Sequence, residues 1–413
     1  MLQAMDDVQR KVDELYKSHF GKVVGSILRF SDSIDFETAE DIAQDSFATA
    51  LIAWSKSGIP DYPEAWLFKV CKNKTLDKIR ENGRVLRELP QKSLEPELFV
   101  KKSIFDDGQL SFLFACANPD LSPKTQVVIT LKYVINLKVE AIAKILGMSI
   151  DGIDKLLVRA RQKIREKRIF FEEPVFEQLK TRLHVVHKIL YLVFNEGYKT
   201  SWGRELIREE LCEDALIMAR ALAQSRISNG ASFALYSLML FNASRFQARF
   251  GKQGELLDLE EQDRTLWNRD LIRLGIANLK LSEGRNISSY HYEASIARLH
   301  CRAGRFADTD WNTISMLYGH LLKTEPNPFV ELNFAIALYF NGQNKKAIDI
   351  LQRLEQEPFL SRYYLLYAAL GRIWLMEGNH ALARKYLEET LGITNSPAEQ
   401  DFIRRLLKKA TRL

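Results

Sequence analysis

Apolar side chains recur at every third or fourth position along almost the whole chain, and this spacing constrains the fold more than any other feature of the sequence. Such a period places the apolar residues on one face of an α-helix, whereas a half-buried β-strand would need alternation. Alternating runs are rare, and no strand–turn–strand pattern stands out. At 413 residues the chain is too long for one core, so the sequence predicts an all-α protein of several domains.

The segment 139–168 predicts two helices joined by a tight turn. Gly147 can adopt the left-handed conformation that ends the first helix, and Ser149 can cap the second by accepting from an otherwise unpaired backbone N–H. Opposite the apolar stripe of the second helix lie seven cations: Lys155, Arg159, Arg161, Lys163, Arg165, Lys167 and Arg168. This layout is typical of a helix-turn-helix whose second helix approaches a polyanion. The alternative is an ordinary helical hairpin with a solvated basic face.

Two further helices carry opposite charge near the start of the chain. Around 38–54 three polar residues share one helical face: Asp41, Gln44 and Asp45. A basic helix around 64–83 carries residues suited to a DNA backbone and base edge: Lys69, Lys72, Asn73, Arg80 and, just beyond, Arg84. Between the two helices, the loop 56–62 offers Tyr62 as a stacking surface for an unpaired base.

Composition excludes several classes of function. The four cysteines are far apart and form no CxxC pair, so we expect no disulfide framework or zinc site, and a reducing cytoplasm as the compartment. His184 and His187 lack a third ligand, so no metal is expected. The chain contains no apolar run of about 18 residues and no GxxxxGK[ST], HExxH or GxSxG motif. We therefore expect no membrane contact, no cofactor, no catalytic residue and no enzyme.

Four segments together resemble the bacterial RNA polymerase sigma factors of the sigma-70 family. They are AEDIAQDSFATALIAW (39–54), PEAWLFKVCKNKTLDKIR (63–80), LSPKTQVVITLKYV (121–134) and the helix-turn-helix. The resemblance is to the extracytoplasmic-function (ECF) group, which retains only the second and fourth conserved regions. It implies region 2 at 8–87, a linker at 88–107 and region 4 at 108–168.

The resemblance also implies partners for these residues. Asp41, Gln44 and Asp45 fall where the family docks on the β′ clamp of core RNA polymerase, while region 4 would contact the β flap. The basic helix and the loop before it fall where the family reads the −10 element of promoter DNA. The −35 element would be read by Ser149, Asp151, Lys155, Arg159 and Arg161. Asp154 and Leu156 stand where the family commonly has basic residues, which indicates an unusual −35 sequence.

The remainder of the chain predicts a helical extension at 174–280 and tetratricopeptide-like (TPR-like) repeats at 281–413. Gly342, Ala347 and Leu351 recur 36 positions later as Gly378, Ala383 and Leu387. The extension also resembles that of one sigma subgroup. It contains a polar set suited either to a ligand groove or interdomain contact, or to capping and salt-bridging between helices: Glu196, Arg208, Glu209, Glu213, Asp258, Glu261, Asp263 and Arg264.

Two functions follow from these patterns. The first is a cytoplasmic sigma factor, associated with the nucleoid when active, whose C-terminal domain modulates activity through a protein partner or an intramolecular contact. The alternative is a stand-alone helix-turn-helix regulator with a ligand- or protein-sensing repeat domain. Only the first needs the acidic face of Asp41 and Asp45, because a stand-alone regulator has no polymerase to dock on.

Overall fold

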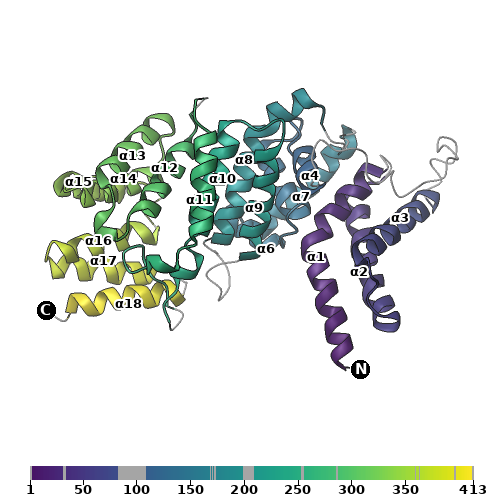
Figure 1. The fold of residues 1–413 in the computed structure, drawn as a ribbon, viewed down its shortest axis with the longest axis horizontal. Coiled ribbons are helices and arrows are strands. Elements are labelled where there is room, and N and C mark those ends of the chain that lie inside the picture. Colours follow the sequence, from purple (N-terminus) through teal and green to yellow (C-terminus); the bar gives the residue numbers. More distant parts are fainter. Residues whose placement is uncertain are drawn as a thin grey trace. The chain divides into compact units, whose positions relative to one another are not determined.

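The computed structural model describes residues 2–30, 34–81, 108–167, 169, 171, 174–198, 209–252, 255–284, 287–358, 360–361, 363–394 and 397–411. Within these ranges every regular element is a helix, apart from one isolated antiparallel bridge between Phe250 and Leu256. The prediction of an all-α fold is therefore confirmed (Figure 1). In the same ranges no helix combines the length and apolar character that a membrane crossing requires.

The chain divides into two compact units, one of Met1–Glu196 with Arg220–Ile227 and the other of Gly197–Ala219 with Ser228–Leu413. The helices that begin in the first unit are α1 (Leu2–Phe30), α2 (Phe36–Ser57), α3 (Pro63–Glu81), α4 (Gly108–Cys116), α5 (Pro123–Tyr133), α6 (Val139–Ile145), α7 (Ile150–Glu166) and α8 (Phe176–Tyr198). The expected linker at 88–107 lies outside the described residues.

Local signals in the sequence set the ends of these helices. Asp35 caps α2 by accepting from the Thr38 backbone N–H, and α2 stops at Gly58, whose φ is 81°. Before α5, the Ser122 hydroxyl accepts from the Thr125 backbone N–H, and Pro123 occupies the first turn of the helix. The end of α2 at Ser57 and the start of α3 at Pro63 leave a short exposed loop between the acidic and the basic helix.

Aromatic rings join the α1–α3 and α4–α7 segments into one core. The Phe36 ring lies 4.4 Å from that of Tyr133 and 4.5 Å from that of Phe171, measured between centroids. On α1, a Cβ added at Gly21 would come within 2.3 Å of the Val134 carbonyl oxygen, so only glycine permits this approach. Arg182 of α8 extends the unit by donating to the Phe114 carbonyl oxygen at 3.0 Å.

The second unit continues the helical pattern toward the C-terminus. Beyond α9 (Glu209–Gln224), which spans the division between the units, its helices are α10 (Gly230–Ala243), α11 (Arg269–Leu281), α12 (Ser289–Arg302), α13 (Trp311–Thr324), α14 (Pro328–Phe340), α15 (Asn344–Leu354), α16 (Tyr364–Met376), α17 (His380–Ile393) and α18 (Pro397–Thr411). Consecutive helices of this series from α10 onward contact one another and lie side by side in Figure 1.

The predicted repeat is present as two helical hairpins, α14–α15 and α16–α17. Gly342 and Gly378 turn the two hairpins with φ of 77° and 73°, a left-handed conformation that favours glycine. Ala347 and Ala383 are both fully buried where the paired helices meet. The 36-residue offset in the sequence thus corresponds to two helical hairpins, each turned by a glycine.

Candidate nucleic-acid interface

The turn between α6 and α7 has the geometry that the sequence predicted. Gly147 has a φ of 60°, and the Met148 N–H closes the end of α6 on the Ala143 carbonyl oxygen at 2.8 Å. Ser149 then caps α7, because its hydroxyl oxygen accepts from the Gly152 N–H at 3.1 Å. The helix-turn-helix is thus built from local signals, and it fixes the direction of α7.

One side of α7 is buried and the other is polar and exposed. Ile153, Leu157, Ala160 and Ile164 form the buried stripe. Ser149, Asp151, Lys155 and Arg159 are exposed, so four of the five residues proposed for the −35 element lie on the accessible side. Lys155 and Asp151 form an ion pair of 2.7 Å, which screens part of the positive charge near the start of the helix.

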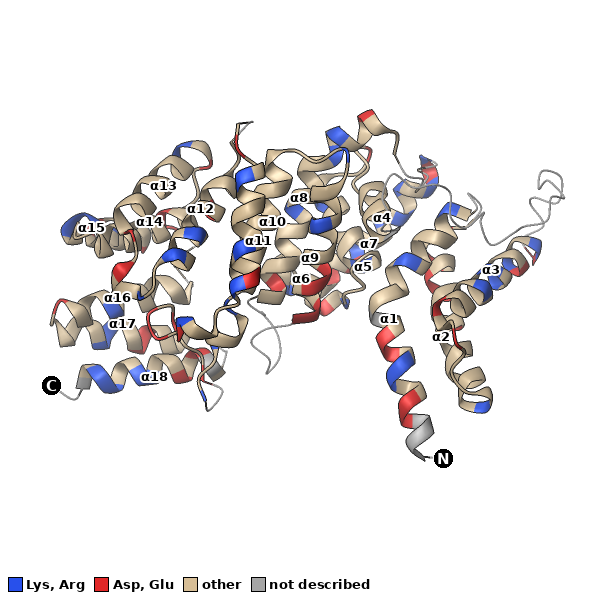
Figure 2. Cartoon of the chain, in the orientation of Figure 1, with Lys and Arg blue, Asp and Glu red and all other residues tan. Residues whose placement is uncertain are grey.

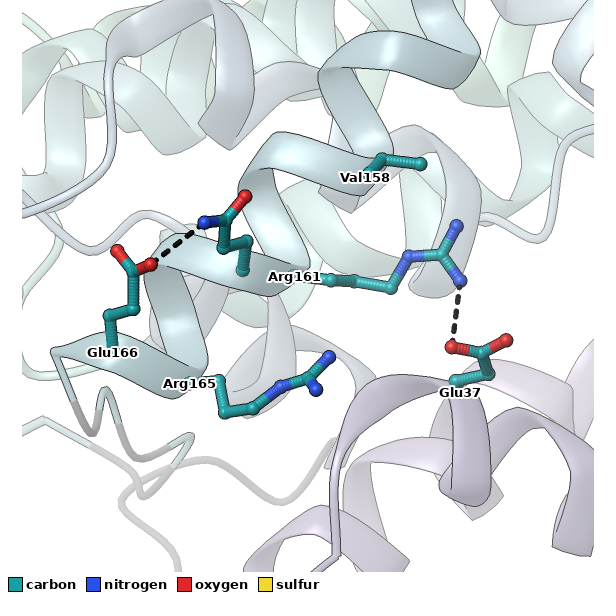
Figure 3. A pocket seen from close by; sticks show the side chains of 6 residues that line it. Glu37, Val158, Arg161, Arg165 and Glu166 are labelled. Atoms are coloured by element: carbon teal, nitrogen blue, oxygen red, sulfur yellow. Dashed lines mark hydrogen bonds and ion pairs between the residues drawn. The ribbon is translucent and has the colours of Figure 1, made fainter.

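Arg161, the fifth of these residues, is turned toward α2 rather than fully into solvent. Its guanidinium lies 3.5 Å from the Glu37 carboxylate. Figure 3 shows this pair across a hollow of about 520 Å³ lined by Glu37, Val158, Arg161, Gln162, Arg165 and Glu166. The cation that the sequence assigned to DNA is therefore held by a carboxylate of the same compact unit in this structure.

Two apolar side chains on the accessible side of α7 were missed from the sequence. Ile150 is 49% exposed and Val158 is 57% exposed. The signal for Val158 was its position three residues after Lys155 and one before Arg159, on the polar face of the helix. Leu156, in contrast, is half-buried, so it belongs to the packing side more than to the accessible one.

Polar residues of α3 share one exposed face. Lys69, Asn73 and Arg80 are exposed and Lys72 is half-buried, while Arg84 lies outside the described residues. Arg80 donates to Asp77 at 2.9 Å, so a carboxylate of the same helix offsets part of its charge. Figure 2 shows basic positions interleaved with acidic ones along this helix.

The inner face of α3 belongs to the core. Leu67 and Cys71 are fully buried, and burial raises the pKa of the Cys71 thiol to about 11. The thiol is therefore protonated and unreactive near neutral pH.

The loop before α3 exposes two large side chains. Tyr62 is 79% exposed and Ile59 is 40% exposed. Gly58 allows the sharp turn at the end of α2 that leads into this loop. An exposed aromatic ring beside a basic helix is a suitable stacking surface for an unpaired base.

The predicted acidic face of α2 is present and exposed. Asp41, Gln44 and Asp45 are all accessible, and Asp45 forms an ion pair of 2.5 Å with Lys74 of α3. Glu40, one residue before this set, is directed elsewhere, since its carboxylate accepts from Lys132 at 2.7 Å and both side chains are largely buried. The face that remains accessible is therefore narrower than the acidic run in the sequence.

Three members of the polar set in the C-terminal half act as capping or salt-bridging groups. Asp258 contacts Arg372 at 2.6 Å, Glu261 lies 3.5 Å from Arg405, and Asp263 caps a 3₁₀ turn by accepting from the Thr265 N–H. Glu209 and Glu213 are exposed on α9, and Glu196 is buried in α8. Arg208 falls outside the described ranges. Arg264 is buried.

The two histidines of α8 have different environments. His184 is exposed, and its Nδ1 lies 3.0 Å from the Thr181 carbonyl oxygen. His187 is buried, and burial lowers its pKa to about 4. Across the part of the chain that the structure describes, no group of three or more His, Cys, Asp or Glu side chains is placed to hold a metal ion.

Comparison with known proteins assigns families to three segments. Residues 15–85 match the family described as sigma-70 region 2, and residues 116–164 match sigma-70 region 4. Residues 182–283 match a family of unknown function, DUF6596. The first two matches contain α2 and α3, and the helix-turn-helix, respectively.

Similar proteins occur in several bacteria. An uncharacterized protein of Rhizobium meliloti (strain 1021) is 31% identical over 392 residues, covering 93% of this chain and 92% of that protein. The ECF RNA polymerase sigma factor SigE of Mycolicibacterium smegmatis is 26% identical over 162 residues, covering 37% of this chain and 60% of that protein. The RNA polymerase sigma factor YlaC of Bacillus subtilis is 23% identical over 163 residues, covering 38% of this chain and 90% of that protein.

Proposed function

The chain belongs to the sigma-70 family of RNA polymerase sigma factors, in its ECF group, and on this premise we propose how its residues serve that role. In this proposal α2 docks on core RNA polymerase, and α3 and α7 read the −10 and −35 elements of a promoter. The observation that supports it most is where the assigned charged residues lie. Carboxylates are exposed on α2, and cations are exposed on α3 and α7.

The polymerase-binding face consists of Asp41, Gln44 and Asp45. Because Lys74 neutralises Asp45 in the free protein, a cationic partner surface has to displace that lysine. An exposed ion pair contributes at most about 1 kcal/mol, so replacing Lys74 by a partner cation costs little free energy. We place the β′ clamp at this face and the β flap at region 4, as the family does.

The −10 element is assigned to α3 and the loop before it. Lys69, Lys72 and Arg80, together with Arg84, would neutralise phosphates, and Asn73 would hydrogen-bond a base edge. Tyr62 would stack on a base that leaves the duplex, because its ring is already exposed and needs no rearrangement.

The −35 element is assigned to the accessible side of α7. Lys155 and Arg159 can contact guanine or phosphate, and Asp151 and Asp154 can accept from the amino group of cytosine. Val158 adds an apolar contact that suits a thymine methyl group. Arg161 joins this set only if DNA draws it away from Glu37.

Transcription with core polymerase tests the proposal. We expect Asp45→Arg to abolish co-purification with core polymerase and to remove promoter-specific run-off transcripts, because it places a cation on the docking face. Glu140→Arg is the matched control, since it makes the same charge change at an exposed position of α6. An Asp45→Arg protein that still co-purifies with polymerase would contradict the docking face. A wild-type protein that binds its promoter without polymerase would instead favour the stand-alone regulator.

We further infer that the C-terminal unit modulates this activity through a protein partner or an intramolecular contact. Repeat scaffolds of stacked hairpins commonly present surfaces for such contacts. A chain ending at Ile227 is the appropriate truncation, because it keeps every residue of the first compact unit, including Arg182. Run-off output that is unchanged by this truncation would contradict a modulating role.

A further inference from the structure

Three arginines of the second compact unit gather around two aromatic rings. The guanidinium carbons of Arg245 and Arg264 lie 5.8 Å and 4.8 Å from the centroid of the Trp267 ring. Those of Arg245 and Arg249 lie 5.9 Å and 4.1 Å from the centroid of the Tyr198 ring. Each ring is thus shared by two cations, and the three side chains form one arginine cluster.

The arginine cluster has no carboxylate partner among the described residues. Arg264, only 7% exposed, donates to the carbonyl oxygens of His300 and Ala303 at 2.6 Å and 2.7 Å. Arg245 donates to Asn242 and the Tyr198 hydroxyl, and Arg249 to the Tyr198 carbonyl oxygen. All of these acceptors are neutral.

Other partly buried arginines of the same unit are neutralised. Arg372 contacts both Asp258 and Glu260, and Arg405 lies 3.5 Å from Glu261. Buried charges are normally paired, because removing a cation from water is expensive unless an anion compensates it. Unlike Arg372 and Arg405, the arginines of the cluster are therefore partly or fully buried without a carboxylate beside them in the part of the chain that the structure describes.

Electrostatics within the cluster is unfavourable without an anion. Burial lowers the pKa of Arg249 and of Arg264, and the neighbouring charge of Arg245 adds to both effects. His300 remains neutral there, since burial and these arginines lower its pKa to about 3. Asp308, which acts on Arg264 from a distance, is already paired with Arg305 at 2.8 Å.

Two N–H groups of the cluster also lack an acceptor. Arg245 Nε and Arg264 Nη2 are buried without a hydrogen-bond partner. Guanidinium groups recognise carboxylate and phosphate oxygens through paired N–H donors. We therefore propose that Arg245, Arg249 and Arg264 form a binding site for a small oxyanion, the phosphoryl or carboxylate group of a metabolite-sized ligand. Arg245 and Arg249 keep part of their surface exposed, which gives such a group access to the site.

Binding of simple anions to the full-length protein tests this site. We expect inorganic phosphate or succinate to raise Tm saturably above that in chloride of equal ionic strength, with a dissociation constant measurable by calorimetry. The stronger of the two anions identifies the ligand group as phosphoryl or carboxylate. Arg249→Met should weaken binding about tenfold or more, because it removes one charge-assisted contact.

Two further variants keep the test informative. Arg245→Lys retains the charge but loses the planar donor pair, so it should fold normally and still bind more weakly. Arg298→Met is the matched control, because Arg298 is an exposed arginine of α12 outside the cluster, and it should bind like wild type. The proposal is overturned if neither anion acts more strongly than chloride. It is equally overturned if all four proteins respond alike, which would indicate an adventitious ion only.

Discussion

A single buried histidine of α8 makes the stability of the folded protein depend on pH. His187 is 3% exposed, and burial lowers its pKa to about 4, against about 6.5 in an unfolded chain. Between these values the unfolded chain binds a proton that the folded protein cannot accept. The stabilising effect of the neutral ring is therefore complete above pH 6.5 and is lost as the pH falls toward 4.

We expect His187→Leu to lessen the loss of stability between pH 7 and pH 5 by about 2 kcal/mol. Urea unfolding at the two pH values measures this difference, which does not depend on how the substitution changes stability at pH 7. His184→Leu is the comparison on the same helix and should retain most of the wild-type loss, because burial lowers the His187 pKa more than the neighbouring charge of His184 does. A His187→Leu protein with the full wild-type loss would show that other groups cause it, His300 being the first to examine.

At the scale of the elements, the second hairpin of the repeat contains one glycine in its turn and one inside a helix. Gly378 turns α16 into α17 with a φ of 73°, whereas Gly392 lies within α17 in ordinary helical conformation. A Cβ added at either position meets no atom within 4 Å, so only the backbone distinguishes the two sites. We expect Gly378→Ala to destabilise the protein by about 1 kcal/mol and Gly392→Ala to stabilise it by about 0.5–1 kcal/mol.

Opposite shifts of the thermal midpoint for these two variants would confirm that interpretation. Shifts of the same sign would show that the φ of Gly378 does not determine the turn. Gly371→Ala extends the comparison, because its Cβ would lie 2.7 Å from Leu387 Cγ and so disturb the packing of α16 on α17.

Helix ends were predictable from the sequence, whereas partners between helices were not. The caps at Ser122 and Ser149 and the turn at Gly147 depend on residues within a few positions, so local rules were sufficient. Lys132 and Glu40 are 92 positions apart, and periodicity carries no information about such a pair. The arginine cluster was missed for the same reason, since Arg264 alone entered the predicted polar set.

At the scale of the whole first unit, regions 2 and 4 share one core in this structure. Phe36 of α2 packs against Tyr133 of α5 and Phe171, and Glu40 pairs with Lys132 beside them. A compact unit of about 200 residues is roughly 40 Å across. Promoter elements at −35 and −10 lie about 25 base pairs apart, or about 85 Å along B-DNA. Reading both elements as proposed therefore requires the two regions to separate.

On this proposal, the Glu40–Lys132 pair opposes promoter binding, because it helps to hold the two regions together. The pair is largely buried, so Lys132→Glu leaves two carboxylates facing each other and weakens the packing of the two regions. We expect Lys132→Glu to lower the free energy of unfolding while the polymerase complex binds its promoter about tenfold more tightly, because less packing has to be broken. Lys124→Glu, the same charge change at an exposed position of α5, should not tighten binding. The double variant Glu40→Lys with Lys132→Glu restores the pair and should return both quantities toward wild type. Promoter affinity that falls in Lys132→Glu as much as in Lys124→Glu would mean that the packed arrangement does not compete with DNA.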